Sequence, residues 1–237
     1  MILKSITLKN YRNYKSQSLV FHPKFNIIHG DNAEGKTNLI EAIYLICNFR
    51  PFKQVKNEEL INFSFETSAI KGELEADNGL NEVHITIKKE GRHTRLNGKI
   101  VYSISRYLGK FKVVLFLPSD IEIIKGSMLS RRKYLDSVIS TIDTAYLKDL
   151  RDYHKALSQR NFLLSSKKPV SPLSYEIWNE KIAEYGTSII KKRVEIIKIF
   201  NEKLFEVYSS SDKSDGHVEI KYIPSFEENG DISSSII

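Results

Sequence analysis

Hydrophobic and polar residues alternate along most of the first half of the chain, which is the pattern of strands that bury one face and expose the other. The alternation predicts strands around residues 2–8 and 19–21, and two longer ones within residues 62–74 and 83–88. The pair Asn97-Gly98 predicts a tight hairpin turn. Together these segments predict an antiparallel sheet with one solvent-exposed face.

Two short runs lack this alternation: residues 25–29 (FNIIH), which are largely apolar, and residues 113–117 (VVLFL), which are apolar throughout. Short apolar runs of this kind are typical of fully buried strands, and we predict a buried strand at each, the second a central one. Between Leu39 and Ile46, apolar residues recur at helical spacing without Gly or Pro. A helix is therefore predicted shortly after the first run.

From residue 119 onward the apolar spacing becomes helical. Apolar and aromatic residues recur in steps of three, four and seven from Tyr146 to Leu164, where Arg160 takes one expected apolar position, and again from Trp178 to Val207. A Ser-, Lys- and Pro-rich stretch at 165–172 separates the two series and indicates a turn. We predict two long helices, the second over about 173–208, that pack along a narrow apolar seam and form a projecting arm. A compact helical bundle is the alternative.

Residues 217–223 alternate again and predict a strand that returns toward the sheet. The patterns thus divide the chain into an α/β lobe over residues 1–117, a helical arm over 118–210, and a last part over 211–237.

Between the first apolar run and the helix, the sequence matches G-x-x-x-x-G-K-[ST], the phosphate-binding loop of nucleotide hydrolases. A strand, a glycine-rich loop and a helix in this order bring backbone N–H groups and the positive end of the helix to the phosphates. Lys36 is expected to reach the β- and γ-phosphates, and Thr37 to bind the Mg²⁺ ion that bridges them. The predicted nucleotide-binding residues are Gly30, Asp31, Asn32, Ala33, Glu34, Gly35, Lys36 and Thr37.

Phosphate-loop hydrolases also need a carboxylate, usually at the end of an apolar strand, to hold the metal and orient water. The nearest match is residues 116–120, where Pro118 interrupts the strand and no Glu follows Asp120. We therefore expect the chain to be the front part of a longer ATPase, able to bind a nucleotide but lacking the residues for hydrolysis.

The formal net charge of +7 lies in the first half of the chain. Residues 1–115 hold 18 Lys and Arg against 11 Asp and Glu, whereas residues 116–237 hold 18 of each. Part of this positive charge is expected to bind the phosphates of the nucleotide. The remainder either binds a polyanion such as DNA or only keeps the protein in solution.

The remaining composition narrows the class of protein. Cys47 is the single cysteine, which excludes an internal disulfide, and the six histidines have no metal-ligand spacing, so no structural metal is expected. The sequence shows neither a signal peptide nor an apolar segment of membrane-spanning length. We expect a cytoplasmic protein without a membrane partner.

Several short stretches match one known family in the same order along the chain. They are residues 8–14 (LKNYRNY), the phosphate loop with residues 38–44, residues 116–120 and 125–126, residues 131–136 (RRKYLD), residues 159–161 (QRN) and residues 222–224. Over nearly its full length the chain resembles the RecF family of bacterial recombination-repair ATPases. The RRKYLD and QRN stretches are the most specific of these matches.

RecF proteins belong with the SMC and Rad50 ATPases. The resemblance implies an α/β fold, namely the first lobe of an ABC-type ATPase head (a mixed sheet with an antiparallel part), together with a helical-hairpin arm. It also implies ATP and Mg²⁺ as cofactors, and a homodimer in which two heads enclose ATP, create a surface for duplex DNA and release the DNA on hydrolysis. The signature loop and the Asp-Glu strand of the family's second lobe are not found in this sequence.

The resemblance implies a role in recombinational repair, the SOS response and replication restart, in which the family acts with RecO and RecR to load recombinase at gaps. It further implies that Arg12 corresponds to an arginine that SMC-type heads direct at the α-phosphate of ATP; a surface arginine at a strand end is the alternative. Ser119 and Asp120 stand where ABC heads often carry a γ-phosphate-sensing Gln, but both are favoured helix-capping residues, and we favour the cap.

A compact basic cluster, Arg131, Arg132 and Lys133, is predicted to contact DNA phosphates. Ion pairing with Asp136 and its neighbours is the alternative. Other classes of protein remain open from the sequence: another SMC-like head such as an overcoming-lysogenisation-type nuclease, a protein-interaction module with an idle loop, or a metabolic kinase, against which the helical arm argues.

Overall fold

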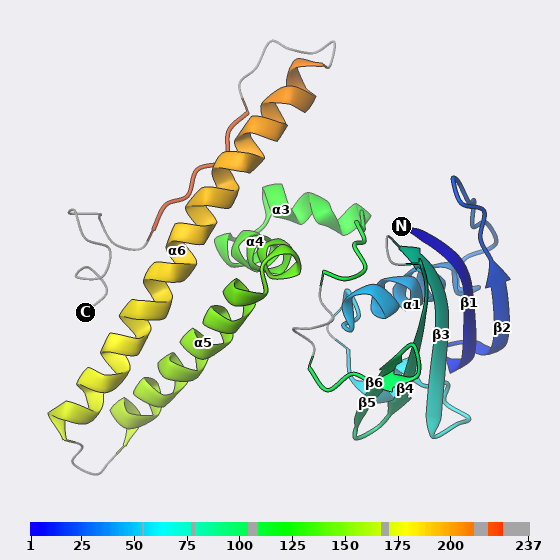
Figure 1. Cartoon of the computed structure of the whole chain (residues 1–237), viewed down its shortest axis with the longest axis horizontal. Coiled ribbons are helices and arrows are strands. Elements are labelled where there is room, and N and C mark those ends of the chain that lie inside the picture. Colours follow the sequence, from blue (N-terminus) through cyan, green and yellow to red (C-terminus); the bar gives the residue numbers. More distant parts are fainter. Residues whose placement is uncertain (54, 77–78, 104–108, 167–170, 211–217, 225–237) are drawn as a thin grey trace. The chain divides into compact units, whose positions relative to one another are not determined.

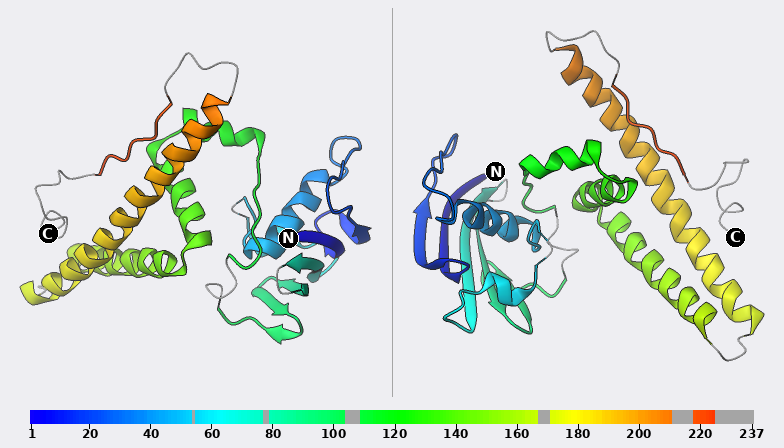
Figure 2. Two further views of the ribbon diagram at one scale, coloured as in Figure 1. Left: turned by 45° about the horizontal axis from the view of Figure 1, so that its top comes forward. Right: turned by 180° about the vertical axis from the view of Figure 1, so that it is seen from behind.

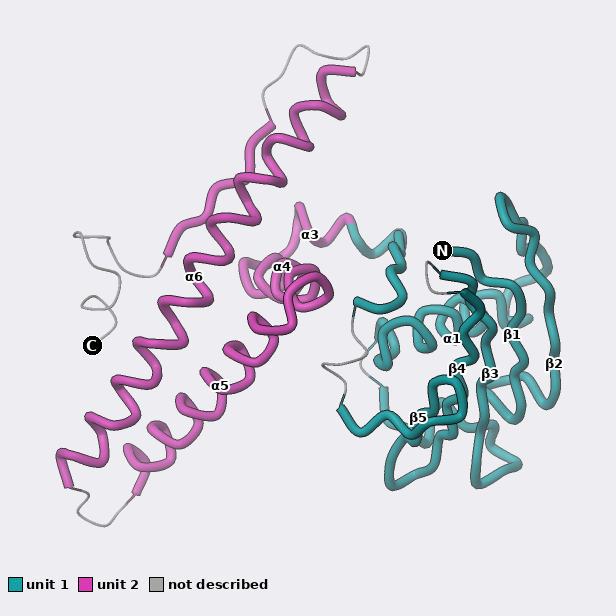
Figure 3. Tube along the Cα trace, in the orientation of Figure 1, with its two compact units in different colours: residues 1–120 teal, residues 121–237 magenta. Residues whose placement is uncertain are grey.

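The computed structural model describes residues 1–53, 55–76, 79–103, 109–166, 171–210 and 218–224. The chain forms two compact units, Met1–Asp120 and Ile121–Ile237 (Figure 3). The domain boundary that we predicted after residue 117 lies close to this division and stays a prediction. Among the described helices, none has the length and apolar content needed to cross a membrane.

The first unit contains a six-stranded antiparallel sheet with a helix against one face (Figure 1). Its strands are β1 (Ile2–Tyr11), β2 (Tyr14–Val20), β3 (Thr67–Ala76), β4 (Gly79–Lys88), β5 (Gly91–Leu96) and β6 (Lys99–Ile100), in the spatial order β2-β1-β3-β4-β5-β6. The predicted antiparallel strands are confirmed. Asn97 and Gly98 form the β5–β6 turn, where their φ values of 49° and 77° are those of a primed hairpin turn.

Helix α1 (Lys36–Asn48) packs on this sheet and confirms the predicted helix after the phosphate loop. Leu39, Ala42, Leu45 and Ile46 of α1 join alternate residues of β1, β3 and β4 in one core, whose sheet side includes Ile6, Leu8, Ile70, Val83, Ile85 and Ile87. At Gly72 in β3, a Cβ atom would lie 2.5 Å from Cδ1 of Ile46, so this glycine permits the close approach of helix and sheet. The opposite face is polar and carries cross-strand ion pairs such as Lys71–Glu82.

The two apolar runs, residues 25–29 and 113–117, do not form strands, and both predictions of a buried strand were wrong. Residues 25–29 and 113–117 carry no strand, and side chains such as Phe25 (73% exposed) and Val114 (96% exposed) face solvent. A strand needs a neighbour that accepts and donates its backbone hydrogen bonds. Within the part of the chain that the structure describes, no strand pairs with either segment.

The first unit also contains a short helix, α2 (Asn57–Leu60). A 3₁₀ turn, Pro118–Ile121, lies at the boundary between the two units. The second unit is helical, with α3 (Glu122–Lys125), α4 (Met128–Ile142), α5 (Thr144–Ser165) and α6 (Pro172–Ser209). Helices α5 and α6 lie antiparallel and side by side (Figure 2), which confirms the predicted hairpin. At the end of the hairpin near α4, the seam contains the residues that the apolar spacing predicts. There, Tyr146 of α5 and Ile189 and Ile196 of α6 form a buried cluster with Ile139 of α4.

Further along the hairpin, Arg160 of α5 donates from Nε to Oδ1 of Asn179 in α6 at 2.6 Å. A polar contact therefore crosses the seam at the position where the apolar pattern is interrupted. Trp178 is half-buried beside it, with the Nζ atom of Lys181 5.0 Å from its ring centre.

The strand that we predicted over residues 217–223 is not formed in its described part, residues 218–223. This segment lies along α6, where the side chain of Asn201 pairs with both backbone groups of Ile220: Nδ2 donates to the carbonyl at 2.9 Å, and Oδ1 accepts the N–H at 2.8 Å. An amide side chain of a helix therefore supplies the hydrogen bonds that a neighbouring strand would have supplied.

Candidate nucleotide-binding site

The phosphate loop runs directly into α1, and its residues from Gly30 to Glu34 are exposed. Gly30 and Gly35 have φ values of 145° and 104°, in a region that favours glycine. Gly35 is also enclosed, because a Cβ atom there would lie 2.6 Å from both amide heteroatoms of Asn13. The second glycine of the motif is therefore required by backbone conformation and by packing.

Helix α1 begins without a side-chain cap and without an acidic residue in its first turn. By contrast, α4 and α5 are capped by Ser127 and Asp143, whose side chains accept N–H groups of the first turn of each helix. The first N–H groups of a helix have no partner within the helix, and they carry its positive partial charge. The start of α1 is therefore suited to an anion, with the exposed side chain of Thr37 in the same turn.

Lys36 lies folded across the loop. Its Nζ atom donates to the carbonyl oxygens of Gly30 and Asp31, at 2.7 Å and 2.6 Å. The backbone N–H of Asp31 donates to Oε2 of Glu34 at 3.0 Å, which closes the loop on itself. The only ammonium group of the motif is thus held at the loop, where a phosphate group would need it.

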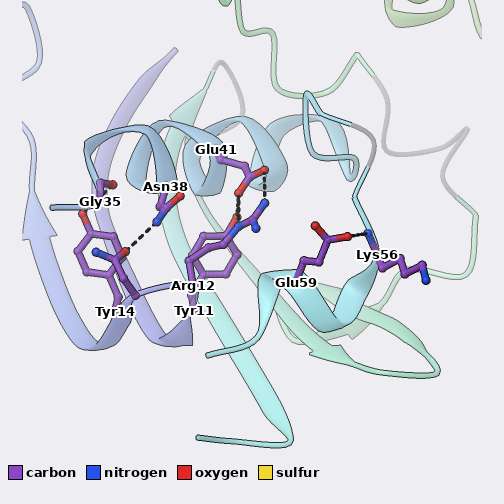
Figure 4. A network of polar contacts seen from close by, with 9 residues as sticks. Tyr11, Arg12, Tyr14, Gly35, Asn38, Glu41, Lys56 and Glu59 are labelled. Atoms are coloured by element: carbon purple, nitrogen blue, oxygen red, sulfur yellow. Dashed lines mark hydrogen bonds and ion pairs between the residues drawn. The ribbon is translucent and has the colours of Figure 1, made fainter. Parts of the chain in front are cut away.

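The turn between β1 and β2 contacts α1 behind the loop (Figure 4). Arg12 donates from Nε and Nη2 to the two carboxylate oxygens of Glu41, at 2.9 Å and 3.0 Å, and the hydroxyl of Tyr11 donates to Oε2 at 2.9 Å. Glu41 is 2% exposed. Burial, and then the neighbouring carboxylate, raise the pKa of the Tyr11 hydroxyl, so that it stays protonated and donates.

The same turn also contacts the loop. Nδ2 of Asn13 donates to the carbonyl of Glu34 at 3.0 Å, while its Oδ1 accepts a hydrogen bond from Nδ2 of Asn38 at 2.8 Å. The hydroxyl of Tyr14 donates to the carbonyl of Gly35 at 3.1 Å.

Of the residues predicted to bind the nucleotide, those from Gly30 to Thr37 lie together in this loop. Arg12 lies outside the loop, in the turn between β1 and β2, and is engaged with Glu41 through Nε and Nη2. A contact of Arg12 with the α-phosphate stays a prediction. Sequence reasoning missed Glu41, although a carboxylate among the buried residues of α1 is a signal that a cation must meet it.

The polar residues at the end of the first unit have a structural role. Oδ2 of Asp120 accepts the N–H of Leu117 at 2.7 Å, and the N–H of Asp120 donates back to the carbonyl of Leu117 at 2.9 Å. This reciprocal pair fixes the start of the 3₁₀ turn, with Asp120 inside the turn rather than at its N-cap. A capping role of Ser119 stays a prediction.

The basic cluster lies in the first turns of α4, and all three of its side chains are exposed. Arg131 donates from Nη1 to the carbonyl of Gly126 at 2.9 Å, at the end of α3. Ion pairing of the cluster with Asp136, part of the alternative, is not found among the described residues, where the carboxylate of Asp136 binds Arg193. DNA contact by Arg131, Arg132 and Lys133 stays a prediction.

An antiparallel sheet, a glycine-rich phosphate loop leading into a core helix, and a helical hairpin define the first lobe of an ABC-type ATPase head and its arm. Residues 2–121 match the family described as the RecF/RecN/SMC N terminal domain, and the chain belongs to that family. The resemblance to RecF is confirmed by the relatives and solved structures that the chain matches.

The chain is 37% identical over 224 residues to the DNA replication and repair protein RecF of Geotalea uraniireducens, covering 94% of this chain and 61% of the relative. It is 35% identical over 236 residues to that of Bacillus cytotoxicus, covering 98% of this chain and 63% of the relative. The chain thus spans less than two thirds of the length of these relatives.

Two solved structures of the recombination mediator protein RecF in the RecFOR pathway are also similar. The RecF-ATP structure superposes with a TM-score of 0.86 at 37% identity, over 99% of this chain and 65% of that protein. The RecF-ATPrS structure superposes with a TM-score of 0.81 at 40% identity, over 87% of this chain and 58% of that protein.

Proposed function

We propose that this chain binds ATP with Mg²⁺ through its phosphate loop, and that it serves recombinational DNA repair and replication restart as part of a RecF-type protein. The observation that carries the proposal is the uncapped start of α1, which follows a glycine-rich loop with Lys36 folded across it. The relative's name, DNA replication and repair protein RecF, and the RecF-ATP structure support the assignment of ATP and of repair.

Four residues of the motif fit roles in triphosphate binding. Gly30 and Gly35 allow the backbone to approach the phosphates, and no side chain caps the N–H groups at the start of α1, which therefore suit an anion. Lys36 supplies a positive charge to the β- and γ-phosphates, and the hydroxyl of Thr37 is an oxygen ligand of the kind that Mg²⁺ prefers.

The wider role follows from the RecF family. A RecF-type protein containing this chain acts in the cytoplasm with RecO and RecR to load recombinase at gaps, and its ATP-bound heads dimerise on DNA. The exposed charges of Arg132 and Lys133 in α4 support phosphate contacts with DNA.

The test is a titration of a fluorescent ATP analogue with Mg²⁺ into the chain and its variants. Lys36→Ala should weaken binding about tenfold or more, because a charge-assisted interaction is worth roughly 1.5–3 kcal/mol. Lys99→Ala, which removes an equally charged and exposed side chain of the same unit, should leave affinity unchanged. Thr37→Ala should weaken binding with Mg²⁺ but not with EDTA.

Equal affinity of Lys36→Ala and the unchanged chain would remove the ATP assignment. Failure of the unchanged chain to bind ATP would do the same, and would favour a protein-interaction module with an idle loop.

A further inference from the structure

The β1–β2 turn touches the phosphate loop at two consecutive carbonyl groups. Asn13 donates to the carbonyl of Glu34 and Tyr14 donates to the carbonyl of Gly35. We propose that this turn, residues Arg12 to Tyr14, is a strap that sets the shape of the loop, and that Asn13 and Tyr14 are positioning residues for the phosphates of ATP. The inference deepens the proposed function and rests on it.

The planarity of the peptide bond explains how a contact between the strap and a loop carbonyl affects the N–H group that would bind a phosphate. In a trans peptide unit, the C=O and the N–H point in opposite directions and rotate together. A donor that holds the carbonyl of Glu34 therefore turns the N–H of Gly35 the other way, and the bond to the carbonyl of Gly35 does the same for the N–H of Lys36. These two N–H groups belong to the set that a phosphate loop offers to its ligand.

The strap is itself held in place without help from the loop. The N–H of Arg12 donates to the carbonyl of Leu60 at 3.0 Å, and the N–H of Asn62 donates to the carbonyl of Asn10 at 2.8 Å. On the other side, the guanidinium of Arg12 binds the buried carboxylate of Glu41 through two nitrogens. The turn is therefore fixed to both the α2 segment and α1, independently of its contacts with the loop.

The backbone of the strap carries a further sign of constraint. Arg12 has a φ value of 51°, in the left-handed region that side-chain-bearing residues rarely adopt. Such a conformation persists where the surrounding contacts enforce it, and it is concentrated at functional sites. The reversal of the chain here gives consecutive residues different targets: Arg12 binds α1, whereas Asn13 and Tyr14 bind the loop.

The amide of Asn13 has a fixed orientation. Its Oδ1 accepts a hydrogen bond from Asn38 in the first turn of α1, which leaves Nδ2 to donate to the loop. The side chain also fills the space next to the α-carbon of Gly35. Asn13 thus connects the strap to both the loop and the start of α1. Its substitution is therefore expected to change the position of the loop N–H groups that bind the phosphates.

The experiment measures binding and local protection in the same variants. Tyr14→Phe removes one hydroxyl and keeps the ring, and Asn13→Ala removes the amide. Gln17→Ala is the matched control, because it removes an exposed amide of the same strand pair. For each protein, the dissociation constant of ATP with Mg²⁺ is measured by calorimetry, the melting temperature by circular dichroism, and amide hydrogen exchange by mass spectrometry.

We expect Tyr14→Phe and Asn13→Ala each to weaken ATP binding by roughly 3- to 10-fold, the equivalent of one hydrogen bond. The melting temperature should stay within about 2 °C of the control, and exchange should quicken in the peptide that holds residues 30–38 but not in β1 or β3. A merely structural role would instead lower the melting temperature and quicken exchange throughout the first unit, which would overturn the proposal.

Unchanged ATP affinity in both variants would also overturn it. If the unchanged chain does not bind ATP, the proposed function fails, and the exchange data alone decide on the strap: faster exchange confined to the loop supports it, and unchanged exchange refutes it.

Discussion

Arg193 of α6 binds Asp136 of α4 inside the helical unit. Its Nη2 atom lies 2.7 Å from Oδ1 and 2.9 Å from Oδ2 of the carboxylate, and its Nε atom lies 2.9 Å from Oδ1. Tyr146 of α5 also donates to Asp136, and Nη1 of Arg193 donates to the hydroxyl of Tyr222 at 3.3 Å. One buried ion pair thus links three helices and the segment that lies along α6.

We predict that Asp136→Ala lowers the free energy of unfolding of the helical unit by about 3–5 kcal/mol, because it leaves the guanidinium of Arg193, 8% exposed, buried without its counter-charge. The single tryptophan, Trp178, lies in α6, so urea unfolding of this unit can be followed by its fluorescence.

Lys203→Ala is the control for this prediction, because the Lys203–Glu206 pair is more than 60% exposed on both sides, and such pairs contribute at most about 1 kcal/mol. The double variant Asp136→Leu/Arg193→Met should lose less stability than Asp136→Ala alone, since no buried charge remains. An equal or larger loss in the double variant would contradict this account of the pair.

The sequence predicts the seam of the hairpin but not this ion pair. Apolar spacing places Tyr146, Ile189 and Ile196 in the seam, and all three are buried. Arg193 fills the gap between Ile189 and Ile196, where a charged residue is usually assigned to the solvent side. Its burial depends on Asp136, 57 residues earlier, and helical spacing carries no information about a partner on another helix.

The site shows the same limit. The motif and its flanking helix predict the phosphate loop, because the determinants are contiguous in sequence. Asn13 and Tyr14 could not be found in this way, since they reach the loop from 21 residues away. Residues 25–29 and 113–117 fail for the opposite reason: their composition suits a buried strand, but composition does not supply the neighbour that a strand requires.

The second prediction concerns Arg12 and Glu41. Arg12→Ala should destabilise the first unit by about 3 kcal/mol, because the carboxylate of Glu41 then lies buried with Tyr11 as its remaining hydrogen-bond donor among the described side chains. Glu41→Gln in the Arg12→Ala background should restore part of the loss, since it removes the unpaired charge. Denaturant unfolding followed by labelling of Cys47 measures both, and no recovery in the double variant would show that charge burial is not the cause.

Cys47 is itself the subject of a third prediction. It is 2% exposed in α1, and burial raises the pKa of its thiol to about 12. Thiolate is the reactive form of cysteine, so Cys47 in the folded protein should react slowly with a disulfide reagent until the first unit unfolds.

The pH dependence of this labelling follows from the direction of the shift. Because the folded-state pKa lies above the unfolded value, the neutral thiol contributes stability below the unfolded pKa, and this contribution is lost as pH rises through the folded pKa. Between pH 7 and 9, labelling of the folded chain should stay slow while that of the urea-unfolded chain rises with the thiolate fraction. Fast labelling of the folded chain at pH 8 would place Cys47 outside the core.

The last prediction tests the basic cluster of α4 as a DNA contact. Arg131 is kept, because it donates to the end of α3 and its loss would disturb that helix. The double variant Arg132→Ala/Lys133→Ala should weaken duplex DNA binding uniformly across sequences and reduce the slope of log affinity against log salt by about 2, since each phosphate contact contributes about 1 to that slope. Fluorescence anisotropy with a labelled duplex at several salt concentrations measures the affinity and the salt slope of each variant.

Lys191→Ala/Lys198→Ala removes two exposed charges from α6 of the same unit and is the control for net charge. Equal slopes in the two double variants would mean that net charge, rather than this cluster, accounts for the attraction to DNA.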